Sequence, residues 1–222
     1  MDKIITIDGP AGSGKSTVSR LVAKKLNFLY LDTGAMYRAV ALQARRMGID
    51  LSDGKKLWRL CEHLDLNFKT DGYHTRLCIG EEDISSAIRT PEMDMLSSRV
   101  SAIGEVRTAM TELQRKIGKG GGLVAEGRDM GTVVFPDADH KFFLTASPEI
   151  RAERRYRERV DRGESVSKTE VEMELRKRDN QDKTRSIAPL VPAEDAKVID
   201  STRLNPDQIV DQILICVKKE KG

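Results

Sequence analysis

The stretch Gly9-Pro10-Ala11-Gly12-Ser13-Gly14-Lys15-Ser16 decides the fold of this chain. It fits the pattern G-x-x-x-x-G-K-S/T, in which a glycine-rich loop surrounds phosphate oxygen atoms with backbone N–H groups. The β-branched run Lys3–Asp8 before it predicts a buried strand, and the apolar spacing over about 14–26 after it predicts a helix. This strand–loop–helix context favours a phosphate-binding loop over a merely flexible glycine-rich turn.

The residue types in this loop suit phosphate chemistry. Glycines let the backbone approach the phosphate closely, and the start of the following helix favours negative charge. Lys15 adds a positive charge near the β- and γ-phosphates of a nucleoside triphosphate, and Ser16 is the candidate ligand of Mg²⁺. The loop therefore predicts an enzyme or switch that uses a nucleotide with a bound metal ion.

The bulk composition describes a soluble globular chain. Its 222 residues are 39% hydrophobic and 33% charged with a net charge of +3, which suits one α/β domain. The three cysteines, Cys61, Cys78 and Cys216, form no C-x-x-C motif, so neither a disulfide framework nor a zinc site is expected. No stretch is typical of a signal peptide or a membrane span, and we expect a cytoplasmic protein.

Strand-like and helical patterns alternate along most of the chain, which predicts a parallel sheet of five strands with helices on both faces. The expected strands are Lys3–Asp8, Phe28–Asp32, Leu123–Gly127, Lys141–Thr145 and Lys197–Asp200. The expected helices cover about 14–26, 34–48, 53–64, 91–117, 148–162, 168–183 and 205–219. The last residues, Lys218–Gly222, are expected to be a solvated end.

The segment of about 65–101 interrupts this alternation. Leu66–Lys69 and Thr75–Ile79 alternate in polarity on either side of a turn-forming stretch at Thr70–Gly72, which predicts a small antiparallel insert. An insert in this place suits a substrate-binding arm, and a decorative insertion is the alternative.

Arginines follow two of the expected strands. Arg128 and Asp129 come directly after Leu123–Gly127, and Arg38 lies just past Phe28–Asp32. Ligands of open α/β sheets bind at these strand ends, so Arg38 and Arg128 are candidates to hold an acceptor phosphate. A structural ion pair is the alternative for each.

Two further clusters of charge lie on expected helices. Arg151–Arg162 is dense in arginine and precedes Gly163, which is compatible with a solvated charged face or with a mobile lid that brings cations to ATP phosphates. Arg178, Asp182 and Arg185 follow the i, i+4, i+7 spacing of one helix face. They form either a salt bridge or polar contacts with a nucleotide sugar and base.

The chain resembles the bacterial cytidylate kinase family over essentially its whole length. The matching segments are Ile7–Thr17, Leu31–Arg38, Gly127–Ala138 and Ala188–Ala193, in the family's order and spacing. The first is shared by many NTPases, whereas the other three are much more specific. The resemblance implies one P-loop kinase domain over residues 1–222, with a nucleoside-monophosphate-binding insert at about 65–101 and a short Arg-rich lid at about 151–167.

The resemblance also implies the reaction and its residues. The γ-phosphoryl group of ATP would pass to CMP or dCMP in the presence of Mg²⁺, through alignment and charge stabilisation, with Lys15, Arg128 and Asp129 as catalytic residues. ATP and Mg²⁺ would contact Gly9, Pro10, Ala11, Gly12, Ser13, Gly14, Lys15, Ser16 and Thr17, with Ser16 as the metal ligand.

The acceptor nucleotide would use a separate set of residues. Thr33, where the family often has serine, would lie near the cytidine, and Arg38 and Arg128 would hold the acceptor phosphate. Ser98, Arg107 and Asp129 would face cytosine, with Ser97 and Ser101 as neighbours that leave the register of Ser98 open. Arg178 and Asp182 would contact the sugar, with Arg185 nearby. Glu126 stands where some members carry aspartate, and either side chain can orient a metal-bound water.

Rival functions remain open within and beyond kinases. A kinase for UMP, AMP or shikimate shares the same loop. A GTP-dependent switch would need a guanine-reading N-K-x-D motif, which the sequence lacks. An RNA-binding module is disfavoured by the near-balanced charge and the single Trp. We expect nucleotide partners, no nucleic acid, no membrane and a monomer.

Overall fold

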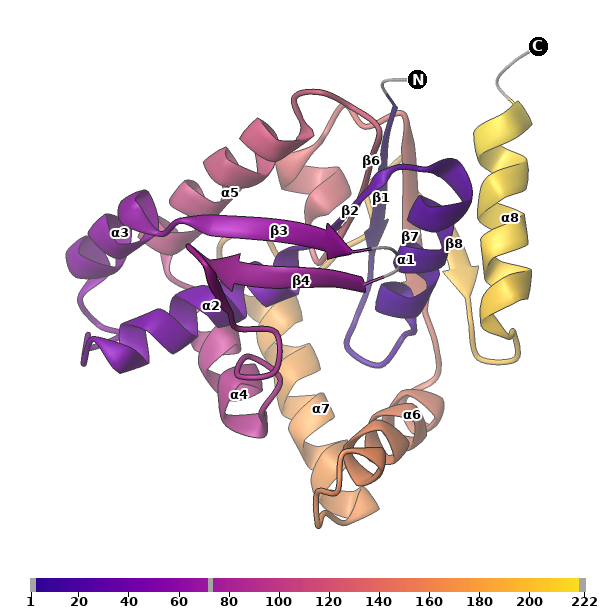
Figure 1. Ribbon diagram of the computed structural model, residues 1–222. Coiled ribbons are helices and arrows are strands. Elements are labelled where there is room, and N and C mark those ends of the chain that lie inside the picture. Colours follow the sequence, from indigo (N-terminus) through magenta and orange to yellow (C-terminus); the bar gives the residue numbers. More distant parts are fainter. Residues whose placement is uncertain (1–2, 72–73, 220–222) are drawn as a thin grey trace. The chain divides into compact units, whose positions relative to one another are not determined.

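Figure 1 shows the computed structural model, which describes residues 3–71 and 74–219. The chain forms two compact units, one made of Met1–Leu31 and Gly121–Gly222 and the other of Asp32–Gly120. The turn predicted at Gly72 and the solvated end predicted past residue 219 lie outside the described residues. Among the helices that are described, none has both the length and the apolar character needed to cross a membrane.

The first unit is built on a five-stranded parallel sheet, as the sequence predicts. Its strands are β1 (Ile4–Asp8), β2 (Leu29–Asp32), β6 (Leu123–Gly127), β7 (His140–Thr145) and β8 (Lys197–Asp200), in the spatial order β2-β6-β1-β7-β8. The central strand β1 pairs with β6 and β7, which places Ile7 between Glu126 and Phe142. The carboxyl ends of β1 and β6 therefore lie together, where the phosphate loop and Arg128 follow.

Helices cover this sheet because alternate residues of each strand point to opposite faces. The unit contains α1 (Lys15–Leu26), η1 (Met130–Val134), α6 (Pro148–Asp161), α7 (Lys168–Thr184) and α8 (Pro206–Lys219). Ile5 and Ile7 are fully buried and form one core with Val22 of α1 and Ile213 of α8. Thr6 points the other way, toward the short π-helical turn η1 at Gly131.

The second unit combines helices with a small antiparallel sheet. Its elements are α2 (Thr33–Arg46), α3 (Gly54–His63), β3 (Leu66–Asp71), β4 (His74–Ile79), β5 (Glu82–Asp83), α4 (Pro91–Val100) and α5 (Gly104–Gly118). Strands β3, β4 and β5 pair in that order, which confirms the predicted antiparallel hairpin and adds a short third strand. Leu77 of β4 is buried against Ala39 of α2 and Met93 of α4, so the sheet shares one core with these helices.

The prediction of one helix over residues 91–117 is wrong. The chain breaks between α4 and α5, where the N–H groups of Ala102 and Ile103 donate to carbonyl oxygens three residues earlier at 3.1 Å. Ile103 then adopts an extended backbone (φ −84°, ψ 122°), and Gly104 after it has a low helix propensity. The apolar spacing continues through the break, so the spacing alone does not reveal it.

Candidate active site

The phosphate loop joins β1 to α1, and its glycines are required by both conformation and space. Gly12 and Gly14 have positive φ angles of 76° and 88°. A Cβ atom at Gly9 would lie 2.1 Å from the carbonyl oxygen of Leu144, and one at Gly12 would lie 2.7 Å from that of Arg151. The loop is therefore in close contact with the end of β7 and the first turn of α6.

Lys15 is the first residue of α1 and is 8% exposed. Its Nζ donates to the carbonyl oxygen of Pro10 at 3.1 Å, which points the ammonium group back over the loop. Burial and the nearby positive charge of Arg128 lower the pKa of Lys15 to about 7, against a partial offset from Glu126. An anion bound at the loop would stabilise the charged form of this lysine.

Ser16 and Glu126 supply oxygen atoms beside the loop. The Ser16 hydroxyl donates to Glu126 Oε2 at 2.9 Å, and the Tyr30 hydroxyl donates to the other carboxylate oxygen. Among the described residues, no group of three or more His, Cys, Asp or Glu side chains is arranged to hold a metal ion. One hydroxyl and one carboxylate fit Mg²⁺, which commonly takes its remaining ligands from water and substrate phosphates.

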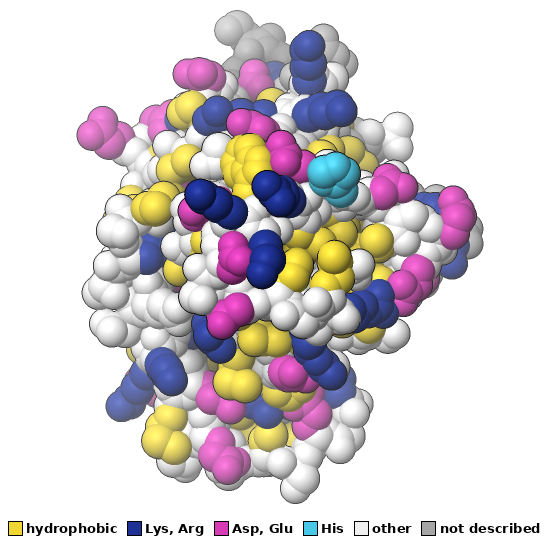
Figure 2. Space-filling view, turned by 90° about the vertical axis from the view of Figure 1, so that its left-hand side faces the viewer, with side chains coloured by type: hydrophobic (Ala, Val, Ile, Leu, Met, Phe, Trp, Pro, Cys, Tyr) yellow, Lys and Arg dark blue, Asp and Glu magenta, His cyan; other side chains and the backbone are white. Residues whose placement is uncertain are grey.

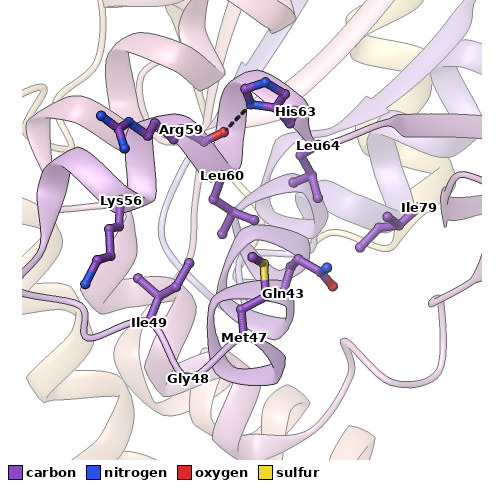
Figure 3. Close-up of a pocket in the computed structure, with 10 residues that line it drawn as sticks. All are labelled: Gln43, Met47, Gly48, Ile49, Lys56, Arg59, Leu60, His63, Leu64 and Ile79. Carbon is purple, nitrogen blue, oxygen red and sulfur yellow. Dashed lines mark hydrogen bonds between the residues drawn. The ribbon is translucent and has the colours of Figure 1, made fainter.

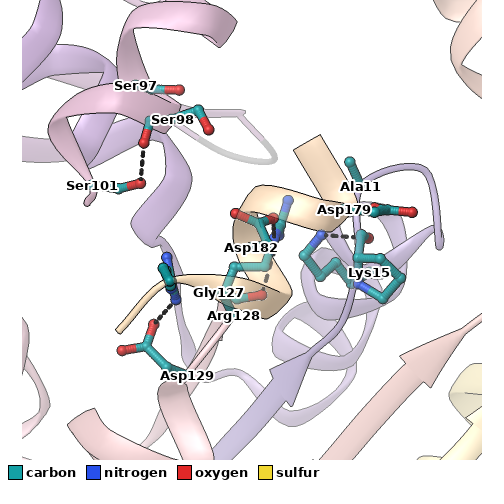
Figure 4. Close-up of polar contacts among 12 residues, drawn as sticks. Ala11, Lys15, Ser97, Ser98, Ser101, Gly127, Arg128, Asp129, Asp179 and Asp182 are labelled. Carbon is teal, nitrogen blue, oxygen red and sulfur yellow. Dashed lines mark hydrogen bonds and ion pairs between the residues drawn. The ribbon is translucent and has the colours of Figure 1, made fainter. Parts of the chain in front are cut away.

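A partly buried ion pair links the end of β6 to α7. Arg128 Nε donates to Asp182 Oδ2 at 2.7 Å, and its Nη1 donates to the carbonyl oxygen of Gly127 at 3.3 Å (Figure 4). Burial by itself would raise the pKa of Asp182, but Arg128 and Arg178 outweigh it and lower this pKa below its ordinary value. Asp182 is therefore held charged, between two residues that the sequence predicts for the acceptor.

Asp129 and Arg185 form the neighbouring pair. Arg185 Nη2 lies 3.6 Å from Asp129 Oδ1, and its Nε donates to the carbonyl oxygen of Ala188 at 2.5 Å. Arg185 caps the end of α7 in an extended conformation, and Ala188 has a positive φ of 51°. The structure thus brings together the predicted residues of the first unit: Lys15, Ser16, Arg128, Asp129, Arg178, Asp182 and Arg185.

Asp8 anchors the turn that follows Asp129. Its two carboxylate oxygens accept hydrogen bonds from the backbone N–H groups of Met130 and Gly131 at 2.9 and 2.8 Å. Burial raises the pKa of Asp8 to about 6, the two N–H donors oppose this rise, and Asp129 adds to it. Asp8 therefore fixes the backbone directly after the Arg128–Asp129 pair.

Four of the five arginines of α6 are engaged in ion pairs: Arg151, Arg155, Arg157 and Arg159. Arg159 donates to Glu164 and Glu174 at 2.7 Å each, so it joins α6, the following loop and α7. Arg151 pairs with Asp179 of α7, and two further pairs lie within α6: Arg155–Glu158 and Arg157–Glu153. Arg162, which caps the end of α6, pairs with Glu158. Closure of this segment over a nucleotide stays a prediction.

The predicted residues of the second unit occupy α2, α4 and α5. Thr33 is the buried first residue of α2, directly after the Asp32 side chain that caps this helix by accepting from Ala35 N at 2.8 Å. Arg38 Nε donates to Asp94 Oδ1 at 3.0 Å, which ties α2 to α4. Arg38 is held in one orientation by a carboxylate that sequence reasoning did not single out.

Ser98 and Arg107 are connected through Ser101. The Ser101 hydroxyl donates to the carbonyl oxygen of Ser98 at 3.0 Å (Figure 4). Arg107 Nη1 donates to the carbonyl oxygen of Ser101, also at 3.0 Å. The guanidinium of Arg107 is nearly buried and lies 5.7 Å from the centre of the Tyr37 ring. Ser97 is buried with its hydroxyl donating to Asp94 O, so Ser98 is the more accessible of the two.

The second unit also contains a cavity of about 610 Å³ (Figure 3). Leu60 and His63 of α3 line it together with Met47 at the end of α2 and Ile79 of β4. None of the residues that the sequence predicts for the site lines this cavity.

With this geometry in view, comparisons with known proteins assign the chain to a family. The model of the family described as Cytidylate kinase matches residues 5–219. The chain belongs to the cytidylate kinase family. A Cytidylate kinase of Geobacter sp. strain M21 is 50% identical over 97% of this chain and 93% of its own length. Those of Carboxydothermus hydrogenoformans and Vibrio cholerae are 50% and 46% identical, each over 95% of this chain and over 95% and 94% of their own lengths.

Solved structures show the same fold at low sequence identity. An uncharacterized protein from Eubacterium ventriosum is 13% identical with a TM-score of 0.53, over 99% of both chains. A shikimate kinase from Bacteroides thetaiotaomicron is 10% identical with a TM-score of 0.50, over 97% of this chain and 98% of the other. The resemblance to cytidylate kinases is confirmed, and this chain is a phosphotransferase by family.

Three residues of this cytidylate kinase family member were not predicted for the site. Asp8 accepts from the backbone directly after Asp129, Tyr30 donates to Glu126, and Asp94 accepts from Arg38. A carboxylate directly before Gly9 at a strand end was a usable signal for Asp8. Tyr30 and Asp94 carried no signal, because only long-range packing brings them to Glu126 and Arg38.

Proposed function

We propose that the chain transfers the γ-phosphoryl group of ATP to CMP or dCMP, giving ADP and CDP or dCDP, in a Mg²⁺-dependent reaction in the cytoplasm. Membership of the cytidylate kinase family supports the reaction. The observation that carries the proposal is the polar cluster at the carboxyl ends of β1 and β6, where the buried Lys15 and the Ser16–Glu126 pair lie beside the Arg128–Asp182 pair. The free thiols of Cys61, Cys78 and Cys216 are compatible with a reducing cytoplasm.

The donor nucleotide uses the phosphate loop in this proposal. Residues Gly9 to Thr17 hold the ATP phosphates, and Lys15 places a positive charge beside them. Ser16 and Glu126 hold Mg²⁺ together with phosphate oxygens and water. Bound there, the metal neutralises charge on the phosphates and helps to align them.

The acceptor nucleotide is held by three groups of residues, which contact its phosphate, its base and its sugar. Arg38 and Arg128 hold the phosphate of CMP, because guanidinium groups match phosphate oxygens in pairs. Ser98, Arg107 and Asp129 read cytosine, and Thr33 lies near the nucleoside. Arg178, Asp182 and Arg185 hold the sugar side. The fixed orientation of Arg38 by Asp94 and of Arg128 by Asp182 supports these roles, since a preoriented side chain loses less entropy on binding.

The chemical step needs no dedicated nucleophile from the protein. An oxygen of the acceptor phosphate forms the new bond to the γ-phosphorus, while the bond from that phosphorus to the bridging oxygen breaks and ADP leaves. Charge spreads over the transferring group in the transition state. Lys15 and Arg128 stabilise this charge, and the family's lid at about 151–167 excludes water from it.

A nucleic-acid function has less support. On the face that Figure 2 shows, basic and acidic side chains are intermixed, whereas nucleic-acid binding favours a continuous basic surface. The whole chain carries a net charge of only +3.

The proposal is tested by a coupled assay of ADP release with ATP and Mg²⁺. CMP, dCMP, UMP, AMP and GMP are compared as acceptors at equal concentrations. We expect the highest kcat/KM for CMP or dCMP and no transfer when Mg²⁺ is removed with EDTA. A preference for AMP or GMP would overturn the proposed substrate, and RNA binding at physiological salt without any transfer would overturn the enzyme.

A further inference from the structure

Helix α6 reaches the phosphate loop through two arginine side chains from the side that the loop carbonyls face. Arg151 Nη1 donates to the carbonyl oxygen of Ala11 at 3.1 Å. One helical turn further, Arg154 Nη1 lies 3.4 Å from the carbonyl oxygen of Ser13. Both residues belong to the Arg-rich run that the sequence predicts as a lid, yet here they contact the backbone of the loop.

Arg151 is fixed by partners on three elements. Its guanidinium makes a two-point contact with the Asp179 carboxylate of α7, at 3.1 and 2.6 Å, and its Nε donates to Ala146 O at 3.2 Å. The side chain is only 8% exposed. Figure 4 shows Ala11 beside Asp179, the two groups that Arg151 joins. Each of the three nitrogen atoms of the Arg151 guanidinium therefore donates at least one hydrogen bond.

Arg154 is fixed by Ser201 at the end of β8. Its Nη1 donates to Ser201 Oγ at 2.9 Å and its Nη2 to Ser201 O at 2.7 Å. The Ser201 hydroxyl, which is fully buried, donates in turn to Ser13 O at 2.9 Å. The carbonyl of Ser13 is thus held by a serine and an arginine together.

The geometry of the peptide unit relates these contacts to the direction of the N–H groups in the loop. In a planar trans peptide, the C=O of one residue and the N–H of the next point in opposite directions. Holding the carbonyls of Ala11 and Ser13 toward α6 and Ser201 therefore directs the N–H groups of Gly12 and Gly14 away from them. Neither N–H has a hydrogen-bond acceptor within the described part of the chain.

We propose that Arg151 and Arg154 are positioning residues that hold the phosphate loop in its anion-binding form, and that they act through the carbonyls of Ala11 and Ser13. Glycines at positions 12 and 14 give the loop freedom to rotate these peptides, so an external hold is needed to preorganise it. This inference rests on the proposed use of the loop for ATP.

The discriminating variant is Asp179→Asn, which releases Arg151 without changing it. If Arg151 acts by positioning, Asp179→Asn and Arg151→Gln both weaken binding of ATP, each by about tenfold, as expected for loss of a charge-assisted contact. Isothermal titration calorimetry measures this for ATP and for inorganic tripolyphosphate. The affinities for ATP and for tripolyphosphate should fall by the same factor, since both ligands use the phosphate loop that these variants change.

Arg45→Gln is the matched control outside the proposed lid and the phosphate loop. Arg45 is 55% exposed and pairs with Glu92, so its loss removes one paired arginine charge without touching the loop, and ATP binding should change less than twofold. Unchanged or tighter ATP binding by Asp179→Asn would overturn the proposal, because a released Arg151 would then be acting directly on phosphate. Failure of the unaltered protein to bind ATP would instead overturn the proposed function.

A second measurement needs no nucleotide. In ¹H–¹⁵N spectra of the folded protein, Asp179→Asn should shift the Gly12 amide resonance and leave Gly14 in place, whereas Ser201→Ala should do the reverse. Thermal unfolding establishes that each variant is folded at the temperature of the spectra. Unmoved resonances for both glycines would refute the positioning role.

Discussion

Glu126 Oε2 accepts a hydrogen bond from Ser16 Oγ at 2.9 Å, which joins the end of β6 to the first turn of α1. The other carboxylate oxygen accepts from Tyr30, so the carboxylate is held at both oxygens. Glu126 is nearly fully buried. A fixed, buried carboxylate beside the phosphate loop is suited to orient Mg²⁺ or its water ligands.

We expect Glu126→Gln to lower kcat by roughly 10–100-fold and to raise the Mg²⁺ concentration needed for half-maximal rate, because the variant lacks the negative charge that favours the metal. Steady-state rates over a Mg²⁺ series measure both. Tyr30→Phe keeps the carboxylate and should give a smaller shift in the same direction. An unchanged Mg²⁺ dependence in Glu126→Gln would remove this residue from the metal site.

ATP binding should take up a proton near pH 8. The pKa of Lys15 is lowered to about 7 by burial and by Arg128, so the lysine is largely neutral at pH 8 until phosphate charge arrives. Calorimetry in buffers of different ionisation enthalpy measures the uptake. Lys15→Met should abolish it and lower kcat by about 10²–10³. The same uptake in both proteins would assign the proton to another group.

Asp8 should make stability fall as pH rises from about 4 to about 6. The native protein keeps a proton on Asp8 up to about pH 6, whereas the unfolded chain releases it near pH 4, so the free energy of unfolding decreases through this window and levels off above it. The difference is on the order of 3 kcal/mol. Urea unfolding of the unaltered protein and of Asp8→Asn isolates this contribution from other carboxylates. A difference between the two that does not vary with pH would contradict the assignment.

Asp129→Ala should reduce use of CMP more than use of UMP. Cytosine offers an amino donor and an N3 acceptor, whereas uracil offers a carbonyl and an N3–H donor, so a carboxylate that accepts from the amine fits cytosine. A buried polar group left unpaired costs roughly 1–3 kcal/mol, and more when it is charged. The ratio of the two kcat/KM values measures the effect. Equal losses for both substrates would move base recognition to other residues.

The segment of about 151–167 should become protected from hydrogen exchange when ATP and CMP analogues are both bound. Gly163 follows α6 with a φ of 80° and open space around it, so it is a suitable hinge at which the backbone of the connecting loop can change conformation. Exchange followed by mass spectrometry compares free and bound protein. Equal protection in the two states would argue against a lid.

Much of the fold followed from the sequence because its signals are local. Glycine spacing in residues 9–16, the β-branched run before it and the alternation of strands with helices are each readable within about a dozen residues. The break between α4 and α5 did not follow, since the same apolar spacing runs through it and only the packed cores on either side require the chain to turn.

For the site, the sequence by itself determined which residue types follow each strand, and from this it predicts phosphate chemistry for Lys15, Arg128 and Asp129. Only the tertiary structure decided their partners. From the sequence, Arg151 is one cation of an Arg-rich helical segment. In the structure, Asp179, 28 residues away, holds it against the phosphate loop. The physical reason is that a guanidinium pairs with whichever carboxylate or carbonyl the fold brings within reach, and that choice depends on packing between segments distant in sequence.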